Sequence, residues 1–158
     1  MIFLRDANES DLPLILAWRS QEKVYQGFYQ QKAPLEWEEH KNWWASRNSG
    51  WKEFIIVLVE DTEMRDVGVV TIGQLDHWSP ELGVMIGEVS LWNKGLGTEI
   101  IKITLEWLQE YAMSHHHITA CHTTILDNNI ASIKLFKKCG FERLGVAREG
   151  ESWYQKQL

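Results

Sequence analysis

Cysteine, proline and long apolar runs are scarce in this sequence of 158 residues, which has two cysteines and three prolines. Cys121 and Cys139 are isolated, so they indicate neither a disulfide framework nor a zinc site. The longest apolar run, from Phe54 to Val59, is far too short to cross a bilayer. The start, MIFLRDANES, lacks the basic segment and apolar stretch of a signal peptide. We therefore expect a cytoplasmic protein with no membrane partner.

Basic character is also missing, since the formal net charge is −6 and no block of Lys and Arg occurs. A nucleic-acid-binding protein usually presents a basic face, so we expect no nucleic-acid partner. The length and the hydrophobic content of 44% fit a single domain over residues 1–158. Tryptophan is abundant instead, with nine residues. We interpret Trp18, Trp43 and Trp44 as core or dimer contacts, which leaves a homodimer open.

Apolar periodicity and turn residues predict a chain that alternates between strands and helices. We expect strands at residues 2–5, 54–60, 67–75, 81–86, 118–124, 141–147 and 152–158, with a polar turn at 61–66. We expect helices near residues 12–19, from Pro34 onward, from the glycine turn to about Met113, and from a cap at Asp127 or Asn128 to Cys139-Gly140. The order βααβββαβαββ predicts an α/β (α+β) fold, a sandwich around a mixed sheet.

The stretch LWNKGLGTEI, residues 91–100, places Gly95 and Gly97 at the start of the longest expected helix. The first turn of a helix has unpaired N–H groups and a partial positive charge, and glycine lets a ligand approach them closely. We interpret the turn as a cradle for phosphates, with Lys94 as an added charge. A tight turn that needs glycine only for its backbone angles is the alternative. The turn is not a P-loop, because it lacks the four residues between glycines and the Gly-Lys-Ser/Thr that follows them. It is not a dinucleotide fingerprint either, because Ile100 stands where the third glycine belongs.

Two segments together resemble a known family. ELGVMIGEVSLWNKGLGTEI, followed about thirty residues later by NNIASIKLFKKCGFERLG, is similar to the GNAT (Gcn-five-related) N-acetyltransferases. The family's Q/R-x-x-G-x-G/A loop corresponds to Trp92 through Gly97, with Trp92 in place of Gln or Arg. Its second signature is matched by Asn129, Ser132, Leu135, Phe136, Gly140 and Phe141. The branch with a W-x-K-G loop includes ribosomal-protein N-terminal acetyltransferases and amino-sugar acetyltransferases. The resemblance implies a GNAT fold with six or seven strands.

The resemblance also implies acetyl-CoA as co-substrate. Backbone N–H groups of the glycine turn would hold the pyrophosphate, and the preceding strand would splay from its neighbour to pair with the pantetheine. Gly87 would supply an oxyanion-stabilising N–H and count as catalytic. Lys137 or Lys138 would meet a CoA phosphate or simply lie in solvent. The residues expected to bind acetyl-CoA are Ile86, Gly87, Trp92, Asn93, Lys94, Gly95, Leu96, Gly97, Thr98, Asn129 and Phe136.

Amine acetylation requires a base, because alkyl amines are mostly protonated at neutral pH. Glu81 is the candidate, since strand alternation puts it on the face of Gly87 and the resemblance places the general-base glutamate there. A strand-end carboxylate in solvent is the alternative. Phe136 replaces the tyrosine that protonates the leaving thiolate in many relatives, so Tyr154, Ser132 or water would serve, or the thiolate leaves unassisted. We interpret Cys139 as a small buried residue and expect no metal site at the adjacent histidines of residues 115–117.

The resemblance implies that the first two helices build the acceptor site. ILAWRSQEKV and EWEEHKNWWASR resemble the nucleotide-linked amino-sugar acetyltransferases, which predicts a small amine acceptor. We expect Arg19, Tyr25, His40 and Trp43 to contact it, because aromatic and cationic groups suit sugars and nucleotides. N-terminal acetylation of a ribosomal or other protein is the alternative. A non-catalytic acyl-CoA-binding module is a further alternative, which only Phe136 favours.

Overall fold

A computed structural model describes residues 1–29 and 31–158, and within them the chain forms a seven-stranded mixed sheet. The strand order is β1-β2-β3-β4-β5-β7-β6, and only the β4–β5 pairing is parallel in the described part of the chain. The strands are β1 (Ile2–Asp6), β2 (Lys52–Glu60), β3 (Glu63–Gly73), β4 (Glu81–Ile86), β5 (Ala120–Leu126), β6 (Glu142–Arg148) and β7 (Glu151–Gln157). This confirms the predicted fold class.

Five α-helices connect the strands in the described residues: α1 (Leu12–Arg19), α2 (Glu22–Tyr25), α3 (Trp37–Ala45), α4 (Leu96–Met113) and α5 (Ile130–Lys138). The short α2 was not predicted, and α3 begins at Trp37 rather than at Pro34. Asn129, not Asp127 or Asn128, caps α5, because its side chain accepts a hydrogen bond from the Ser132 N–H. The predicted end of α4 at Met113 is confirmed.

The β2–β3 hairpin corrects the predicted polar turn at residues 61–66. Strand pairing continues to Glu60 and Glu63, so the tight turn consists of two residues. The tip of the hairpin is exposed and polar, which left no apolar alternation to mark it as strand.

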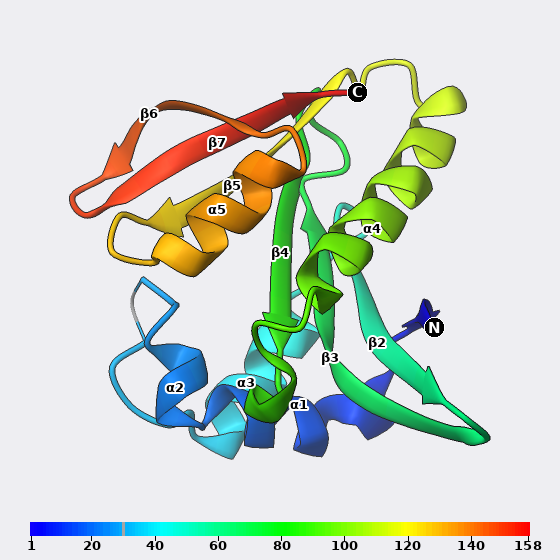
Figure 1. Cartoon of the computed structure of the whole chain (residues 1–158), viewed down its shortest axis with the longest axis vertical. Helices are drawn as coiled ribbons and strands as arrows, with labels where there is room; N and C mark the ends of the chain where they lie inside the picture. The colour runs from blue at the N-terminus through cyan, green and yellow to red at the C-terminus, as the bar shows by residue number, and fades with distance from the viewer. Residues whose placement is uncertain (30) are drawn as a thin grey trace.

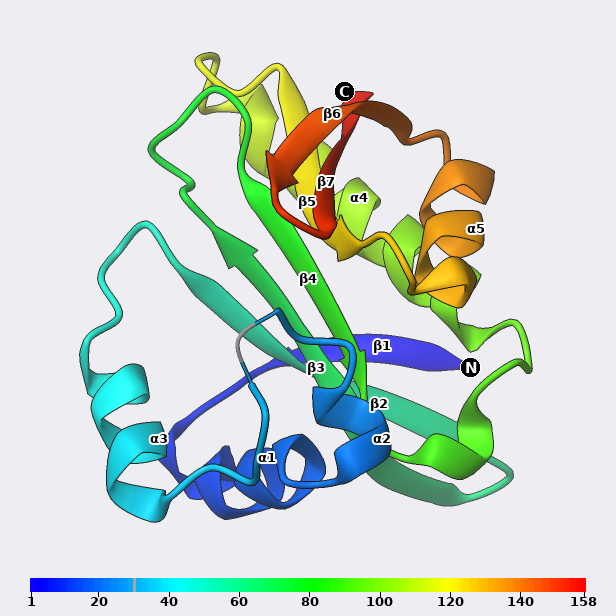
Figure 2. The same ribbon diagram turned by 90° about the vertical axis from the view of Figure 1, so that its left-hand side faces the viewer.

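The helices form one layer on each face of the sheet (Figures 1 and 2). We call the face covered by α1 and α3 the front face, and the face covered by α4 and α5 the back face. The larger core lies on the back face, where Ile100, Ile101 and Leu108 of α4 meet the sheet. A smaller core on the front face centres on Ile15 and Trp18 of α1. Both cores stabilise β3 and β4, the strands that carry the site.

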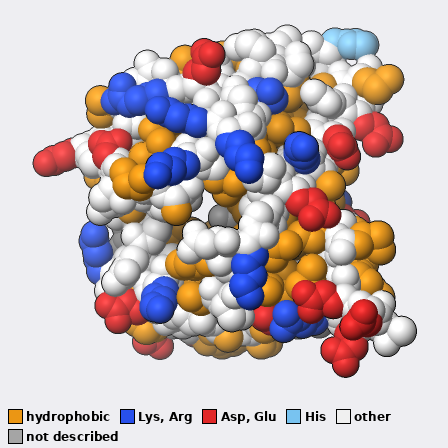
Figure 3. Space-filling model, in the orientation of Figure 1, with side chains coloured by type: hydrophobic (Ala, Val, Ile, Leu, Met, Phe, Trp, Pro, Cys, Tyr) orange, Lys and Arg blue, Asp and Glu red, His pale blue; other side chains and the backbone are white. Residues whose placement is uncertain are grey.

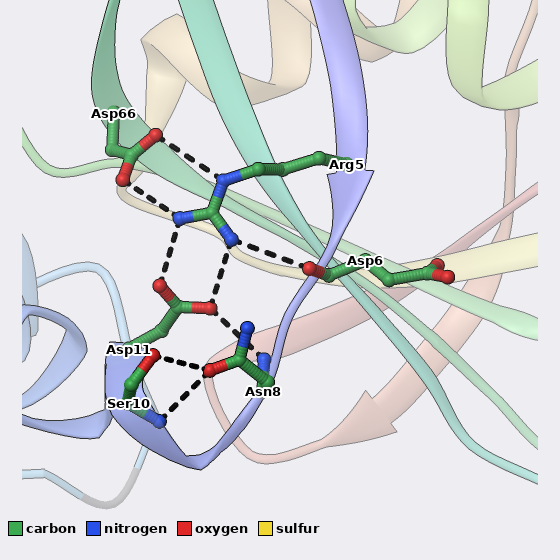
Figure 4. Close-up of polar contacts among 6 residues, drawn as sticks. All are labelled: Arg5, Asp6, Asn8, Ser10, Asp11 and Asp66. Atoms are coloured by element: carbon green, nitrogen blue, oxygen red, sulfur yellow. Dashed lines mark hydrogen bonds and ion pairs between the residues drawn. The ribbon is translucent and has the colours of Figure 1, made fainter.

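A charged network fixes the start of α1 to the sheet (Figure 4). The Arg5 guanidinium of β1 donates to both carboxylate oxygens of Asp11, at 2.7 and 3.0 Å, and to Asp66 of β3 at 2.7 Å. The hydrogen bond from Arg5 lowers the pKa of Asp11, and the same carboxylate accepts the Asn8 N–H. Such bidentate pairs are geometrically specific. They therefore set where α1, and with it Arg19, lies on the front face.

Candidate active site

Strands β4 and β5 separate soon after they meet. In the described residues they share one register pair, Glu81 with His122, and the Thr123 hydroxyl donates to the Leu82 carbonyl at 2.8 Å. Beyond Leu82 the strands diverge (Figure 1). Backbone groups on alternate residues point to the same side of a strand. The remaining backbone of β4 on this side, from Val84 to Ile86, therefore faces an opening, as the resemblance implied.

The glycine turn places the N-terminus of α4 beside this opening. Gly95 is the N-cap with φ of +83°, and no side chain caps the first N–H groups of the helix. Asn93 also has positive φ, 62°, a conformation that Asn tolerates better than most residues. A Cβ on Gly95 would meet nothing within 4 Å. The turn therefore requires glycine for its backbone angle, and the space above the helix N–H groups is open.

Gly97 has a different reason to be glycine. A Cβ there would lie 2.6 Å from Cδ2 of Leu135 in α5. The second glycine therefore lets α4 and α5 pack closely, and the contact of its backbone with acetyl-CoA stays a prediction.

Trp92 contacts the open edge of β4 directly. Its indole N–H donates to the Ile86 carbonyl at 2.9 Å, the group that faces the opening. Together, the uncapped 18-residue helix, the open space at Gly95 and the free edge of β4 fit an extended anionic ligand such as acetyl-CoA. When bound, acetyl-CoA supplies the thioester that the amine attacks.

Gly87 does not offer a free N–H for an oxyanion. Its N–H donates to the Val67 carbonyl at 2.8 Å, and its carbonyl accepts from the Gln21 side chain at 2.8 Å. A Cβ on Gly87 would lie 2.1 Å from the Trp18 ring. We therefore correct the catalytic role expected for Gly87: glycine is required there because a buried tryptophan packs on the backbone.

Asn129 and Phe136 of the second signature have structural roles. Asn129 caps α5, and its Nδ2 would lie 3.5 Å from a Cβ on Gly27, so it borders the segment after α2. Phe136 is buried in the back-face core, edge-on to Phe141 at 5.1 Å. The contact of Phe136 with acetyl-CoA stays a prediction.

Basic side chains gather on one part of an otherwise acidic molecule. Figure 3 shows Lys and Arg over the upper half of the face seen in Figure 1, where α5 lies. Lys137 and Lys138 in the last turn of α5 are exposed. Their position suits a phosphate contact as well as ordinary solvation, so both interpretations stand.

A cavity of about 160 Å³ opens on the front face above β4. Glu53, Thr71 and Gly83 pair across β2, β3 and β4 and form a row on its floor. Gly83 leaves the cavity open, since a Cβ there would meet only Thr71 at 3.7 Å. The other lining residues are Ile15, Arg19, Phe28, Trp43, Val69, Val84 and Met85.

Charged side chains converge on one wall of the cavity. The Trp43 ring lies 5.0 Å from the guanidinium of Arg19 and 3.7 Å from that of Arg47. Arg47 forms an ion pair with Glu53, which is only 7% exposed. Burial raises the pKa of Glu53 to about 7 despite both arginines, and burial lowers the pKa of Arg19. Perturbed groups of this kind in a cavity mark functional sites.

Sequence reasoning missed Glu53 and Arg47. Glu53 stands directly before six apolar strand residues, so alternation could not assign it to a face. A charged residue at the start of a strand buried on both sides is the signal that was available.

His40 does not line the cavity, which corrects its expected acceptor contact. It is 1% exposed, and its Nε2 lies 3.1 Å from the Leu12 carbonyl. The ring stacks on Trp43 at 5.3 Å, and burial lowers its pKa. His40 therefore holds α3 against α1. Tyr25 of α2 is half-buried and also lies outside the cavity lining, whereas Arg19 and Trp43 do line it.

Other candidates have local roles. Cys121 is buried, and burial raises its pKa to about 12; burial also raises the pKa of Cys139, which packs against the core. His115 stacks on Tyr111 at 3.8 Å, and His117 lies 2.9 Å from the Leu75 carbonyl. Among the residues with a described position, no group of three potential ligands could hold a metal ion. The same residues include no helix long and apolar enough to span a membrane.

Comparison with known proteins assigns the fold and site to a family. Residues 2–142 match the acetyltransferase (GNAT) domain, so the chain belongs to the GNAT acetyltransferase family. This confirms the predicted family of acetyltransferases.

The chain is 41% identical to an uncharacterized protein of Methanocaldococcus jannaschii over 157 residues, 99% of this chain but 31% of that protein. The chain thus spans about a third of this curated relative. A crystal structure of a domain from the same organism superposes with a TM-score of 0.94 at 41% identity, covering 100% of this chain and 99% of the other.

More distant solved structures share the fold. Aminoglycoside acetyltransferase AAC(6')-Ib in complex with coenzyme A has a TM-score of 0.78 at 17% identity, covering 99% of this chain and 95% of that one. Spermidine N-acetyltransferase from Vibrio cholerae, in complex with CoA and spermine, has a TM-score of 0.77 at 16% identity, covering 99% of this chain and 94% of that one.

Proposed function

We propose that the chain transfers the acetyl group of acetyl-CoA directly to the primary amine of a small molecule, a nucleotide-linked amino sugar. Glu81 takes up a proton from the amine as it attacks the thioester. The turn from Trp92 to Thr98 binds the pyrophosphate through its backbone N–H groups. The Ile86 N–H, which alternation directs to the opening, replaces that of Gly87 as the oxyanion donor.

Arg19 is the observation that carries the acceptor class. Its guanidinium lines the cavity between the rings of Phe28 and Trp43, at 5.7 and 5.0 Å. Within residues 1–29 and 31–158 it forms no direct ion pair; burial lowers its pKa, and the charge of Glu53 offsets this only in part. Desolvated charge costs free energy unless a partner compensates. An acceptor with a phosphate supplies that partner, and aromatic rings suit its sugar.

The size of the cavity supports a small acceptor. A volume of about 160 Å³ admits one end of a ligand, so the nucleotide would extend outward past α2. The names of the distant structural neighbours also denote acetyltransferases of small amines, an aminoglycoside and spermidine.

The test combines acetyl-CoA with two acceptors, a UDP-linked 4-amino-sugar and a peptide with N-terminal alanine, and measures free thiol. We expect turnover with the sugar and much less with the peptide. Arg19→Gln should raise the acceptor KM by about tenfold and leave the acetyl-CoA KM within about twofold. Arg143→Gln, on exposed β6, is the matched control and should change neither.

The other outcomes identify the alternatives. Faster acetylation of the peptide would replace the sugar by a protein N-terminus as the acceptor. Acetyl-CoA binding without thiol release from a panel of amines would indicate a non-catalytic acyl-CoA-binding module.

A further inference from the structure

Three polar side chains meet where β4 and β5 part. His122 of β5 is the register partner of Glu81, and its Nε2 lies 3.9 Å from Oε2 of Glu81. On the other side of the ring, Nδ1 lies 3.0 Å from the hydroxyl of Ser79, which precedes β4. The His122 N–H also donates to the Pro80 carbonyl, which fixes the backbone under the ring. The imidazole is therefore fixed at Nδ1 by a hydrogen bond, while Nε2 faces Glu81 without a direct hydrogen bond.

The contacts restrict what each ring nitrogen can do. Ser79 occupies Nδ1 at hydrogen-bond distance, and Nε2 faces the carboxylate at a separation that one rotation or a bridging water closes. If Nδ1–H donates to the hydroxyl oxygen, Nε2 carries a lone pair toward Glu81. In that tautomer the imidazole can accept a proton from the carboxyl group.

The surroundings of Glu81 and His122 shift their pKa values toward each other. Burial raises the pKa of Glu81, and Glu151 of β7 adds to this while Arg148 of β6 opposes it. Burial lowers the pKa of His122, with His77 acting in the same direction and Ser79 against it. The Trp153 ring covers the imidazole edge-on at 5.0 Å. The two shifts reduce the difference in pKa between the groups, which favours proton exchange between them.

We propose that His122 is a positioning residue that relays the proton from Glu81 during acetyl transfer. The N–H bond of the attacking amine breaks as an O–H bond forms on Glu81. That O–H bond then breaks as an N–H bond forms at Nε2 of His122, which leaves an imidazolium beside the restored carboxylate. The thiolate departs with its electron pair and takes a proton from solvent. The inference rests on the proposed function, because it assumes that Glu81 serves an amine.

The first test measures the tautomer and the pKa of His122 and needs no turnover. In ¹⁵N-histidine protein at pH 8, long-range ¹H–¹⁵N spectra should show His122 as the Nδ1–H tautomer, with the signal assigned by its loss in His122→Asn. Glu81→Gln should lower the pKa of His122, because it removes a neighbouring anion. The Nε2–H tautomer, or a His122 pKa that Glu81→Gln leaves unchanged, would overturn the relay.

The second test measures the steady-state kinetics of variants at both residues. Glu81→Gln should lower kcat by about 10²-fold, and His122→Asn by about tenfold, with both KM values within about twofold. His122→Asn should also remove one ionisation from the pH dependence of kcat, and the double variant should be no slower than Glu81→Gln alone. His116→Asn, an exposed histidine before β5, is the control and should match the parent. Additive losses in the double variant would refute the shared path.

The two tests separate the failures. A protein without acetyltransferase activity but with the expected tautomer and coupling would overturn the proposed function. An active protein without the coupling would overturn only the relay.

Discussion

The two sites beside β4 differ in the groups that form them: one consists of backbone and the other of side chains. Toward β5, the groups that would bind acetyl-CoA are backbone: the free edge of the strand and the uncapped start of α4. On the front face, the cavity proposed to bind the acceptor is built from side chains of α1, α3, β2 and β3, such as Arg19, Trp43 and Glu53. A backbone site requires unusual φ angles and leaves glycines in the sequence. A side-chain site depends on packing between distant segments and leaves no local motif.

The largest effect we expect concerns Glu53, the most buried charge of the side-chain site. Burial raises its folded pKa to about 7, from the ordinary carboxyl value of 4.5. The folded state therefore holds the proton more tightly than the unfolded chain, and stability falls as pH rises from about 4.5 to about 7. Glu53→Gln lacks this loss, so it should be more stable than the parent at pH 8 by up to about 3 kcal/mol.

Urea unfolding of both proteins at pH 4.5, 6 and 8 measures this difference. The two should have similar free energies of unfolding at pH 4.5 and diverge above it. Parallel pH dependences would mean that Arg47 compensates the burial of the carboxylate fully, and that the cavity wall is an ordinary ion pair.

Two glycines of the same strand region give the next effect. Gly87→Ala should lose about 1–3 kcal/mol of stability, because its Cβ would overlap the buried Trp18 ring. Gly83→Ala is the matched control, since its Cβ has only an ordinary contact with Thr71. We expect it to unfold within about 0.5 kcal/mol of the parent while raising the acceptor KM. Equal stability losses would contradict the distinction between a packed and an open glycine.

The smallest effect tests the backbone site. Gly95→Asn should keep the fold, because Asn tolerates positive φ and the space is open. Its side chain would lie over the helix N–H groups, so the Kd for acetyl-CoA should rise by about tenfold in calorimetry. Gly150→Asn, with φ of +77° and no neighbour within 4 Å, is the matched control. An unchanged Kd in folded Gly95→Asn would contradict the interpretation of the glycine turn as a phosphate-binding site.

The same division explains what the sequence could predict. The order of strands, the end of α4 and the family followed from periodicity and from the glycine and Asn129 motifs. Gly87 and His40 were misassigned because their environments depend on Trp18 and Leu12, residues that are distant in the chain. Glu53 was missed because the six residues that follow it in the strand are all apolar and give no alternation. The short α2 lacks the length for a recognisable periodicity.

The close approach of Gly97 to Leu135 has a consequence for sequence variation among relatives. The two positions share one volume, so a larger residue at 97 requires a smaller one at 135, and the pair should covary. Gly95 shares volume with no neighbour, so a substitution there should need no compensating change elsewhere in the chain. The two glycines of this one motif are thus expected to tolerate different substitutions.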